Sequence, residues 1–442
     1  MPKKHVDAIL LIYHHPVVRN APTIMEHVTS FEKYSQFPVI KVNTECGLDP
    51  RLRDLRFPVV VFHYSLFGCE QYLIGEPWYE YFETLRDAYK IAFFQDEFHG
   101  CPKRFGFLNT WNVHCVYSLY DPRYWDQLYL KYTNVAKVRH TLTGFVDEVA
   151  LDYRRRWVQP GRPRSLDVGY RARKLPFYMG AGAQEKWWVA RDFLDRTRTL
   201  GLKTDISWRE EDRIYGTDWY RFVASCRGML GAESGVSISD PDGEFIRQYR
   251  ELEAAQPTIT FEDATDKLLR RYENNIPLRT ISPRSFEAAA LDTCQILLEG
   301  DYNGILVPWR HYLPLKKDYS NFDEVLRAFT DPATRGSIVK AAFQDLVASG
   351  KYSYRSFIQN FDRALIEDAN GGVSPGDSSE RELQSEFYNR QRWRLKRRLA
   401  QVVAMQGASR LLKLSGFAVR RFPFAWRQRV RKMLGLPVRE HP

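Results

Sequence analysis

The sequence predicts two α/β domains, each built on a parallel β-sheet, followed by a basic helical tail. Short apolar runs alternate with helical patterns through the first 150 residues, and the alternation restarts after a Pro- and Gly-rich basic stretch at 154–164. Continuous apolar strands separated by helices are typical of βαβ units whose sheet is buried on both faces. The third observation is a sharp change of charge from residue 387 onward.

In the first domain, runs rich in Val, Ile and Phe predict strands, and apolar residues at helical spacing predict the helices between them. We expect strands at 6–13, 37–42, 59–63, 90–95, 114–119 and 135–139, and helices at 23–34, at 77–89 and from 121.

The second domain repeats the pattern with one interruption, an irregular and charge-rich helical insertion at 243–272. We expect strands at 165–173, 202–208 and 227–232, and helices at 184–200 and 218–226. Residues 281–300 are expected to form a turn, a short helix and a strand, 305–315 and 322–329 end the alternation, and a long helical region runs to about 368. The predicted boundaries are 1–153 for the first domain, 154–165 for a linker, 166–369 for the second domain, 370–381 for a flexible linker and 382–442 for the tail.

Composition excludes several classes of protein. The 442 residues are 44% hydrophobic, which is enough for sizeable cores and argues against a disordered chain. The longest apolar runs fall far short of a membrane span. The six cysteines are scattered without a CxxC pair, so neither a zinc site nor a disulfide framework is predicted. A reduced, cytoplasmic protein fits these features.

The basic character belongs to the tail. Of 65 basic and 54 acidic residues, 15 basic residues and one acid lie in 387–442, so this segment carries +14 and the rest of the chain −3. Trp393, Leu395, Leu399 and Val402 fall at helical spacing among the arginines, which favours a helix lying on an anionic membrane surface through 382–442. Nucleic-acid binding is the less favoured alternative, because apolar stripes are not needed to neutralise phosphates. Packing of these helices on the body, or on a second copy, is a third possibility.

Three strand ends of the second domain carry unusual residues. The first strand ends in "GYRARK" (169–174), and paired arginines suit a diphosphate because the guanidinium fork matches phosphate oxygens. Glu233-Ser234-Gly235 follows a later strand, where small residues let a ligand approach the backbone. A solvated basic loop and a plain turn explain these two segments almost as well.

The third strand end precedes "ISPRSFEAAALDTCQILLEG" (281–300). Ser282 is expected to cap a helix with Pro283 at its first position, and the helix N-terminus offers N–H groups to a phosphate. Glu287, one turn in, can accept two hydrogen bonds from a ribose diol. Helix-end electrostatics alone also explain an acid there. Because all three signals fall in one α/β domain, a nucleotide diphosphate site is the better interpretation.

These residues resemble a known family. "FEAAALDTCQIL", "DVGYRAR", "LKTDISWREEDRIYG" and "LGAESG" are similar to the donor-binding domain of GT-B glycosyltransferases of group 1, in particular the spore-maturation-like branch. The resemblance covers 167–329, and in the first domain only the strand–helix alternation and "HTLTGFVDE" (140–148) fit. It implies two Rossmann-like domains that face each other across a cleft, with sugar transfer from a nucleotide-sugar donor and neither a cofactor nor an obligatory metal.

The resemblance also assigns residues. Glu287 would bind the donor ribose, and Arg171 and Lys186 would neutralise the diphosphate. Many relatives have a second glutamate eight positions earlier, where this chain has Arg279, and Glu233 is the nearest substitute. This departure leaves the donor-sugar contact and the stereochemistry open. The full set expected at the donor is Arg171, Arg173, Lys186, Arg209, Ser234, Gly235, Ser285, Phe286 and Glu287.

An inverting transferase also needs a general base in the first domain. "FFQDEFHG" (93–100) follows a strand there, and Asp96 and His99 are the candidates, with Glu233 as the third predicted catalytic residue. A hydrogen-bonded loop cluster is the alternative explanation of 93–100.

The function that follows is a glycosyltransferase, hexosyltransferase-like, acting in cell-surface polysaccharide synthesis. It would use a glycan or lipid-linked acceptor and sit at the inner face of the membrane through its tail. A sugar-nucleotide epimerase or a phosphorylase of the same fold is one alternative, and a non-enzymatic membrane- or nucleic-acid-binding protein is another.

Overall fold

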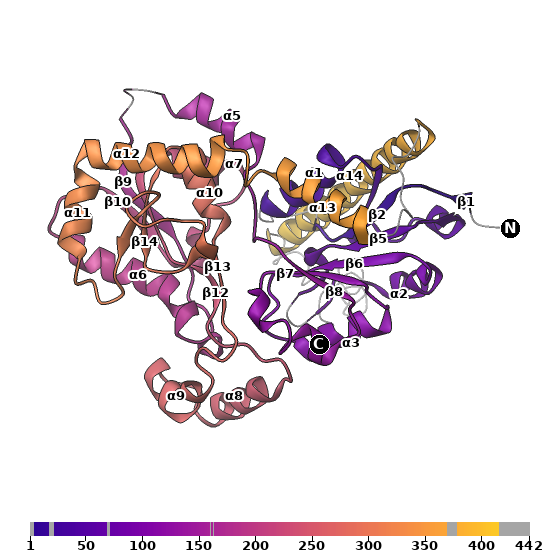
Figure 1. The fold of residues 1–442 in the computed structure, drawn as a ribbon, viewed down its shortest axis with the longest axis horizontal. Coiled ribbons are helices and arrows are strands. Elements are labelled where there is room, and N and C mark those ends of the chain that lie inside the picture. Colours follow the sequence, from indigo (N-terminus) through magenta and orange to yellow (C-terminus); the bar gives the residue numbers. More distant parts are fainter. Residues whose placement is uncertain are drawn as a thin grey trace.

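A computed structural model of the chain describes residues 4–16, 22–68, 71–159, 161, 163–368 and 378–414, with side chains described as far as 401. Two α/β lobes lie side by side (Figure 1). Each lobe is built on one parallel sheet with helices packed against it, so the predicted fold class of two Rossmann-like domains is confirmed.

The first sheet has six parallel strands in the order β3-β2-β5-β6-β7-β8. Its inner strands β2 and β5 are apolar throughout, which is typical of strands buried on both faces. The strands are β2 (Ile9–Tyr13), β3 (Val39–Asn43), β5 (Val59–Phe62), β6 (Tyr89–Phe93), β7 (Cys115–Ser118) and β8 (Lys137–His140), with β1 (Lys4–His5) and β4 (Leu55–Arg56) as a separate pair. The helices of this lobe are α1 (Pro22–Tyr34), α2 (Glu76–Phe82), α3 (Cys101–Thr110) and α4 (Tyr129–Tyr132). Helix α5 (Glu148–Trp157), which follows β8, packs on the second lobe (Figure 1).

Two of these helices differ from the prediction. Helix α3 was not predicted from the sequence; its Pro102 lies in the first turn, where the missing N–H costs nothing. Phe105 and Leu108 of α3 are buried in the first core. Helix α5 was not predicted either, and because it continues to Trp157 the expected linker at 154–165 begins with helical residues.

The second sheet has five parallel strands in the order β10-β9-β11-β14-β15. The strands are β9 (Leu166–Arg171), β10 (Thr204–Ser207), β11 (Cys226–Gly231), β14 (Cys294–Leu298) and β15 (Leu313–Leu315). The helices are α6 (Ala181–Thr197), α7 (Thr217–Ser225), α10 (Pro283–Ala290), α11 (Phe322–Thr330) and α12 (Pro332–Ala342).

The charge-rich insertion forms a separate arm below the second lobe in Figure 1. It leaves and rejoins the lobe through an antiparallel hairpin of β12 (Ser234–Val236) and β13 (Leu278–Thr280). The arm consists of α8 (Glu244–Ala255) and α9 (Phe261–Lys267), which pack around Ile238, Phe245 and Tyr249. The insertion therefore has a small core of its own.

The last described helices return to the first lobe. In α13 (Tyr354–Asp368), Phe357, Ile358 and Phe361 pack into the core beside the first sheet. This helix was expected to close the second domain, and its apolar face instead covers the first.

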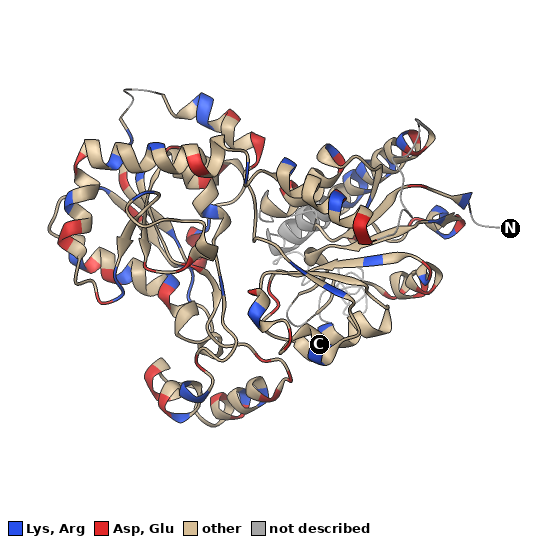
Figure 2. Ribbon diagram, in the orientation of Figure 1, with Lys and Arg blue, Asp and Glu red and all other residues tan. Residues whose placement is uncertain are grey.

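Helix α14 (Ser378–Leu414) also lies on the first lobe, along the edge strand β3, with Lys and Arg recurring along it (Figure 2). The amide oxygen of Gln391 accepts from the backbone N–H of Asn43 at 2.8 Å, and Phe387 is fully buried. At least this part of the expected tail therefore packs on the body, the third possibility considered above; residues 415–442 lie outside the described residues. No helix of the described chain is both long and apolar enough to cross a membrane.

Candidate active site

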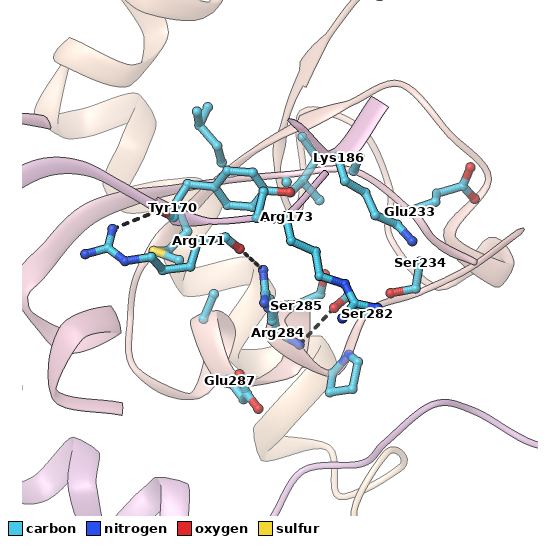
Figure 3. A pocket seen from close by; sticks show the side chains of 18 of the residues that line it. Tyr170, Arg171, Arg173, Lys186, Glu233, Ser234, Ser282, Arg284, Ser285 and Glu287 are labelled. Carbon is cyan, nitrogen blue, oxygen red and sulfur yellow. Dashed lines mark hydrogen bonds between the residues drawn. The ribbon is translucent and has the colours of Figure 1, made fainter. Parts of the chain in front are cut away.

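A cavity of about 430 Å³ lies between the two lobes, at the carboxyl ends of their strands. This is where open parallel sheets place their ligands. Thr23, Asp96 and Phe98 line it from the first lobe, and the second lobe supplies the remaining wall, shown close up in Figure 3. The cavity brings together most of the predicted residues: Asp96, Arg171, Arg173, Lys186, Glu233, Ser234, Gly235, Ser285 and Glu287.

The N-terminus of α10 opens onto this cavity. The Ser282 hydroxyl accepts from the N–H of Arg284, and Pro283 occupies the first turn, so the predicted cap is confirmed. Ser285 is buried one turn in and lines the cavity. The N–H groups of Arg284 and Ser285 already donate to Ser282, so the positive end of the helix dipole is what favours an anion here.

Glu287 lies one turn inside α10, half-buried in the cavity wall. One carboxylate oxygen accepts from the Trp219 indole N–H at 2.6 Å, and the other has no hydrogen-bond partner among the described residues. Burial raises the pKa of Glu287, and the Trp219 hydrogen bond and the Arg284 charge oppose this shift. The carboxylate is thus held in position with one oxygen left for a ligand.

Three cationic side chains, those of Arg173, Lys186 and Arg284, lie around the same space (Figure 3). Lys186 Nζ donates to the Gly235 carbonyl at 2.8 Å. Burial, and next the neighbouring Arg279 charge, lower the pKa of Lys186 to about 8. Arg284 donates to the Arg171 carbonyl and stacks over the Trp219 ring at 5.0 Å. Such a cluster is suited to a diphosphate.

Arg171 has other partners. Its guanidinium donates to the carboxylate of Asp205 at 3.0 Å and to the Asp212 carbonyl at 2.9 Å, and it stacks on Phe222. These contacts fix the β10 side of the lobe and neutralise the charge. The diphosphate role expected for Arg171 fits Arg173 better, because Arg173 has no acidic partner among the described residues.

Gly235 lets the β12–β13 hairpin pass close to the cavity. Its φ is 96°, and a Cβ there would lie 1.8 Å from the Leu278 carbonyl oxygen. Only glycine fits this position without strain.

We therefore expect Gly235→Ala to lower the free energy of unfolding by about 1–3 kcal/mol from backbone strain alone, and by more if the hairpin must separate. Gly336→Ala is the matched control, since Gly336 lies in α12 and a Cβ there meets nothing within 4 Å. The control should be neutral or stabilising by up to about 1 kcal/mol. Urea denaturation of the two variants measures both effects, and equal midpoints would contradict the account of the hairpin.

Both carboxylate oxygens of Glu233 accept hydrogen bonds from neighbouring parts of the fold. One accepts from the Tyr302 N–H at 2.9 Å and the other from Arg279 Nε at 3.0 Å. Arg279 also donates to Glu185 at 2.5 Å. The hairpin places Arg279, the position where relatives of the resembled family have glutamate, against Glu233. The catalytic role predicted for Glu233 would need these buried contacts to be broken.

Asp96 faces the cavity from the first lobe, on the loop after β6. Its carboxylate has no hydrogen bond or ion pair among the described residues. Desolvation of the carboxyl group by the surrounding protein raises the pKa of Asp96, and the positive charges of Lys186 and Arg173 oppose this shift. A raised pKa suits a general base that must accept a proton near neutral pH.

The Asp96 loop is held by two buried charged residues. The Arg104 guanidinium donates to the carbonyls of Glu97, Asp96 and His99 at 2.8, 3.1 and 3.2 Å. The Glu97 carboxylate accepts from the Ser118 hydroxyl at 2.8 Å and from the Tyr129 hydroxyl. The hydrogen-bonded loop cluster considered above is therefore present, and it fixes Asp96.

Three predicted residues lie away from the cavity. His99 is buried against Tyr178 with its Nε2 unpartnered, and burial lowers its pKa to about 3. Phe286 is buried in the core and packs on Tyr352 at 5.6 Å. Arg209 is exposed and pairs with Asp212 at 2.8 Å. Phe286 lies on the face of α10 that packs into the core of the second lobe.

Several residues in the wall were not predicted from the sequence, among them Tyr170, Arg213, Trp219 and Arg284. Arg284 could have been found, because it follows the helix cap directly. Trp219 gave no such signal, since its contact with Glu287 joins positions 68 residues apart.

Comparison with known proteins gives only distant likenesses. No protein-family model matches the sequence, and no curated protein matches it. The solved structure of HepE from Anabaena with UDP is similar at a TM-score of 0.44 and 9% identity, over 81% of this chain and 100% of HepE. Sucrose-phosphate synthase from Thermosynechococcus elongatus gives 0.42 and 11%, over 82% and 98%. TarM gives 0.38 and 10%, over 72% of this chain and 55% of TarM, so the chain spans about half of TarM. TM-scores below 0.5 do not define an activity.

Proposed function

We propose that this chain is a GT-B glycosyltransferase that moves a sugar from a nucleotide-sugar donor to an acceptor across the interlobe cavity. One observation carries the proposal: the α10 N-terminus, three cations and the Glu287 carboxylate meet in one cavity opposite Asp96. This is the combination that a nucleoside diphosphate with a departing sugar requires.

In this proposal the diphosphate lies at the α10 N-terminus, between Arg173, Lys186 and Arg284. Their positive charges stabilise the negative charge that grows on the leaving diphosphate, which is the role a metal plays in other transferases. The free oxygen of Glu287 accepts from a ribose hydroxyl.

Asp96 is the proposed general base. It removes the proton from the acceptor hydroxyl as that oxygen attacks the sugar, and the sugar–phosphate bond breaks with its electron pair going to the diphosphate. Because Asp96 attacks no carbon itself, a single displacement inverts the anomeric centre. Proton NMR of the first-formed product gives the anomer, and retention would exclude this role.

We also propose a family branch, a reaction type and an acceptor for this chain. The resemblance of residues 167–329 to the donor-binding domain of group 1 GT-B glycosyltransferases supports membership of the spore-maturation-like branch and hexosyl transfer without a metal. A glycan or lipid-linked acceptor of cell-surface polysaccharide synthesis suits α14, which exposes Trp393, Tyr388 and Leu399 among its arginines. An enzyme held at the inner face of the membrane would meet such an acceptor.

Ligand-induced thermal stabilisation tests the donor site. UDP, GDP, dTDP, ADP and CMP are added separately, and we expect one nucleotide at 100 times its Kd to stabilise the protein by about 2.7 kcal/mol. Glu287→Ala should lose most of this shift, because the ribose contact is gone.

Glu324→Ala, which removes an exposed glutamate near the start of α11, is the matched control and should keep the full shift. If no nucleotide shifts the melting temperature, or if Glu287→Ala responds like Glu324→Ala, the assignment of the site is wrong. Product that forms only when an acceptor is present separates a transferase from an epimerase.

A further inference from the structure

A second cavity, of about 420 Å³, lies between α14 and the first lobe. It is bounded on one side by β2, β3 and α1 and on the other by α14. Tyr13, Met25, Val39 and Leu395 give it apolar walls. Its volume is within the range of small-molecule sites, and none of the residues that line it lines the donor cavity.

The helix faces this cavity with two adjacent stripes. Gln384, Gln391 and Leu395 recur at helical spacing, and Gln384 and Gln391 bond to the backbone of β3. The neighbouring stripe is Tyr388, Arg392 and Lys396, spaced by four residues. The first stripe docks the helix, and the second forms the outer rim of the cavity.

The charge of the rim is positive. The Lys41 ammonium is nearly buried and paired with Glu32, so these two charges cancel. Arg392 and Lys396 are exposed and have no acidic partner among the described residues. Side chains four apart on a helix are neighbours, at a spacing that suits one phosphate. Tyr388 and Leu399, 47% and 44% exposed, extend the apolar surface outward from the rim.

Helix α1 connects this cavity to the donor cavity. Thr23 lines the donor cavity, whereas Met25, Thr29 and Glu32 line the cavity under α14. From Thr23 to Glu32 the helix rises by about 14 Å. Helix α1 therefore contributes residues to both cavities.

We propose that the cavity under α14 binds the hydrocarbon chain of a lipid-phosphate-linked acceptor, with the phosphate held between Arg392 and Lys396. An apolar cavity with a cationic rim matches an amphiphile with an anionic head. The inference rests on the proposed glycosyl transfer for the role of this lipid as acceptor, but the binding site itself is defined by these residues alone.

The test uses the full chain and dodecyl phosphate below its micelle concentration, with binding measured by calorimetry. We expect saturable binding to the wild type and at least a tenfold weaker Kd for the double variant Arg392→Glu/Lys396→Glu. Both side chains are exposed, so this variant should fold normally. Lys340→Glu, an exposed charge reversal in α12 of the other lobe, is the matched control and should bind as the wild type does.

A second variant tests the chain-binding wall. Leu395→Arg should abolish binding, whereas Leu130→Arg, at an exposed leucine of α4, should not. Equal affinity for dodecyl phosphate and the uncharged dodecyl maltoside would overturn the phosphate assignment. Binding only to phosphatidylglycerol vesicles, unchanged in the double variant, would place lipid contacts elsewhere and overturn the site. Dodecyl phosphate binding without any nucleotide shift would support the lipid site and remove the glycosyltransferase proposal instead.

Discussion

Replacing Asp96 with asparagine is expected to lower kcat for glycosyl transfer by about 10²- to 10⁴-fold while leaving donor affinity nearly unchanged. The asparagine side chain keeps the shape of aspartate but cannot accept the acceptor's proton at neutral pH. Asp96 makes no hydrogen bond or ion pair among the described residues, so its loss should leave the fold intact. Initial rates with the donor named by the nucleotide panel, together with the nucleotide thermal shift, measure the two effects separately.

Two control variants accompany Asp96→Asn. His99→Gln removes the other candidate base, which is buried away from the cavity, and should alter kcat much less than Asp96→Asn. Asn360→Asp, at an exposed residue of α13 that does not line the cavity, is a charge change of the opposite sense and should be neutral. A kcat for Asp96→Asn within threefold of the wild type would exclude Asp96 as the base.

The pH dependence should follow the same assignment. Because the pKa of Asp96 is raised from its ordinary value, kcat/KM should increase with pH as the carboxylate ionises. Asp96→Asn should lose this ascending limb. An ascending limb that persists in Asp96→Asn would assign it to another group.

Most of the fold was accessible from the sequence because burial on both faces leaves parallel strands as plain apolar runs. Ile9–Tyr13 and Val59–Phe62 are such runs, and they are neighbouring inner strands of the first sheet. Helix α3 is harder to predict, because a proline in the first turn looks the same in sequence as a proline that ends a helix. The destination of α13 and α14 depends on surfaces distant in sequence, and local pattern does not contain that information.

The residues of the candidate site also divide into those that local sequence predicts and those that depend on contacts distant in sequence. Ser282, Ser285 and Glu287 follow from helix-end chemistry, which is local, and the structure brings them to the cavity. Arg171 was chosen as a phosphate ligand because an arginine at a strand end looks free in sequence. Its acidic partner, Asp205, lies on the neighbouring strand β10, and only the strand pairing shows that the charge is already neutralised.

Replacing Lys186 with methionine should lower kcat/KM by about 10²- to 10³-fold, because one of the cations that stabilise the departing diphosphate is lost. Lys186→Arg keeps the charge and should retain most of the activity. Matched control variants are Lys340→Met and Lys340→Arg, which change an exposed lysine remote from the cavity.

The pH dependence of kcat/KM is the measurement that tests the role of Lys186. Its pKa is lowered to about 8 in the folded protein, so the wild-type kcat/KM should fall as pH rises through about 8 and the ammonium loses its proton. A bound diphosphate favours the charged form, so the fall in kcat should come at higher pH than the fall in kcat/KM. In Lys186→Arg the descending limb should vanish, since arginine stays protonated.

Stability should move in the opposite direction from activity over the same interval. The unfolded chain keeps Lys186 protonated up to its ordinary pKa of 10.5, so between about pH 8 and pH 10.5 the unfolded state binds more protons than the folded state. The contribution of Lys186 to the free energy of unfolding therefore becomes more favourable as pH rises through this window, while kcat/KM declines. Urea denaturation of the wild type and Lys186→Met at pH 7 and pH 9.5 measures that difference. If the buried ammonium serves catalysis, activity and stability should change in opposite directions as pH rises. If Lys186 served only the fold, activity and stability would decline together.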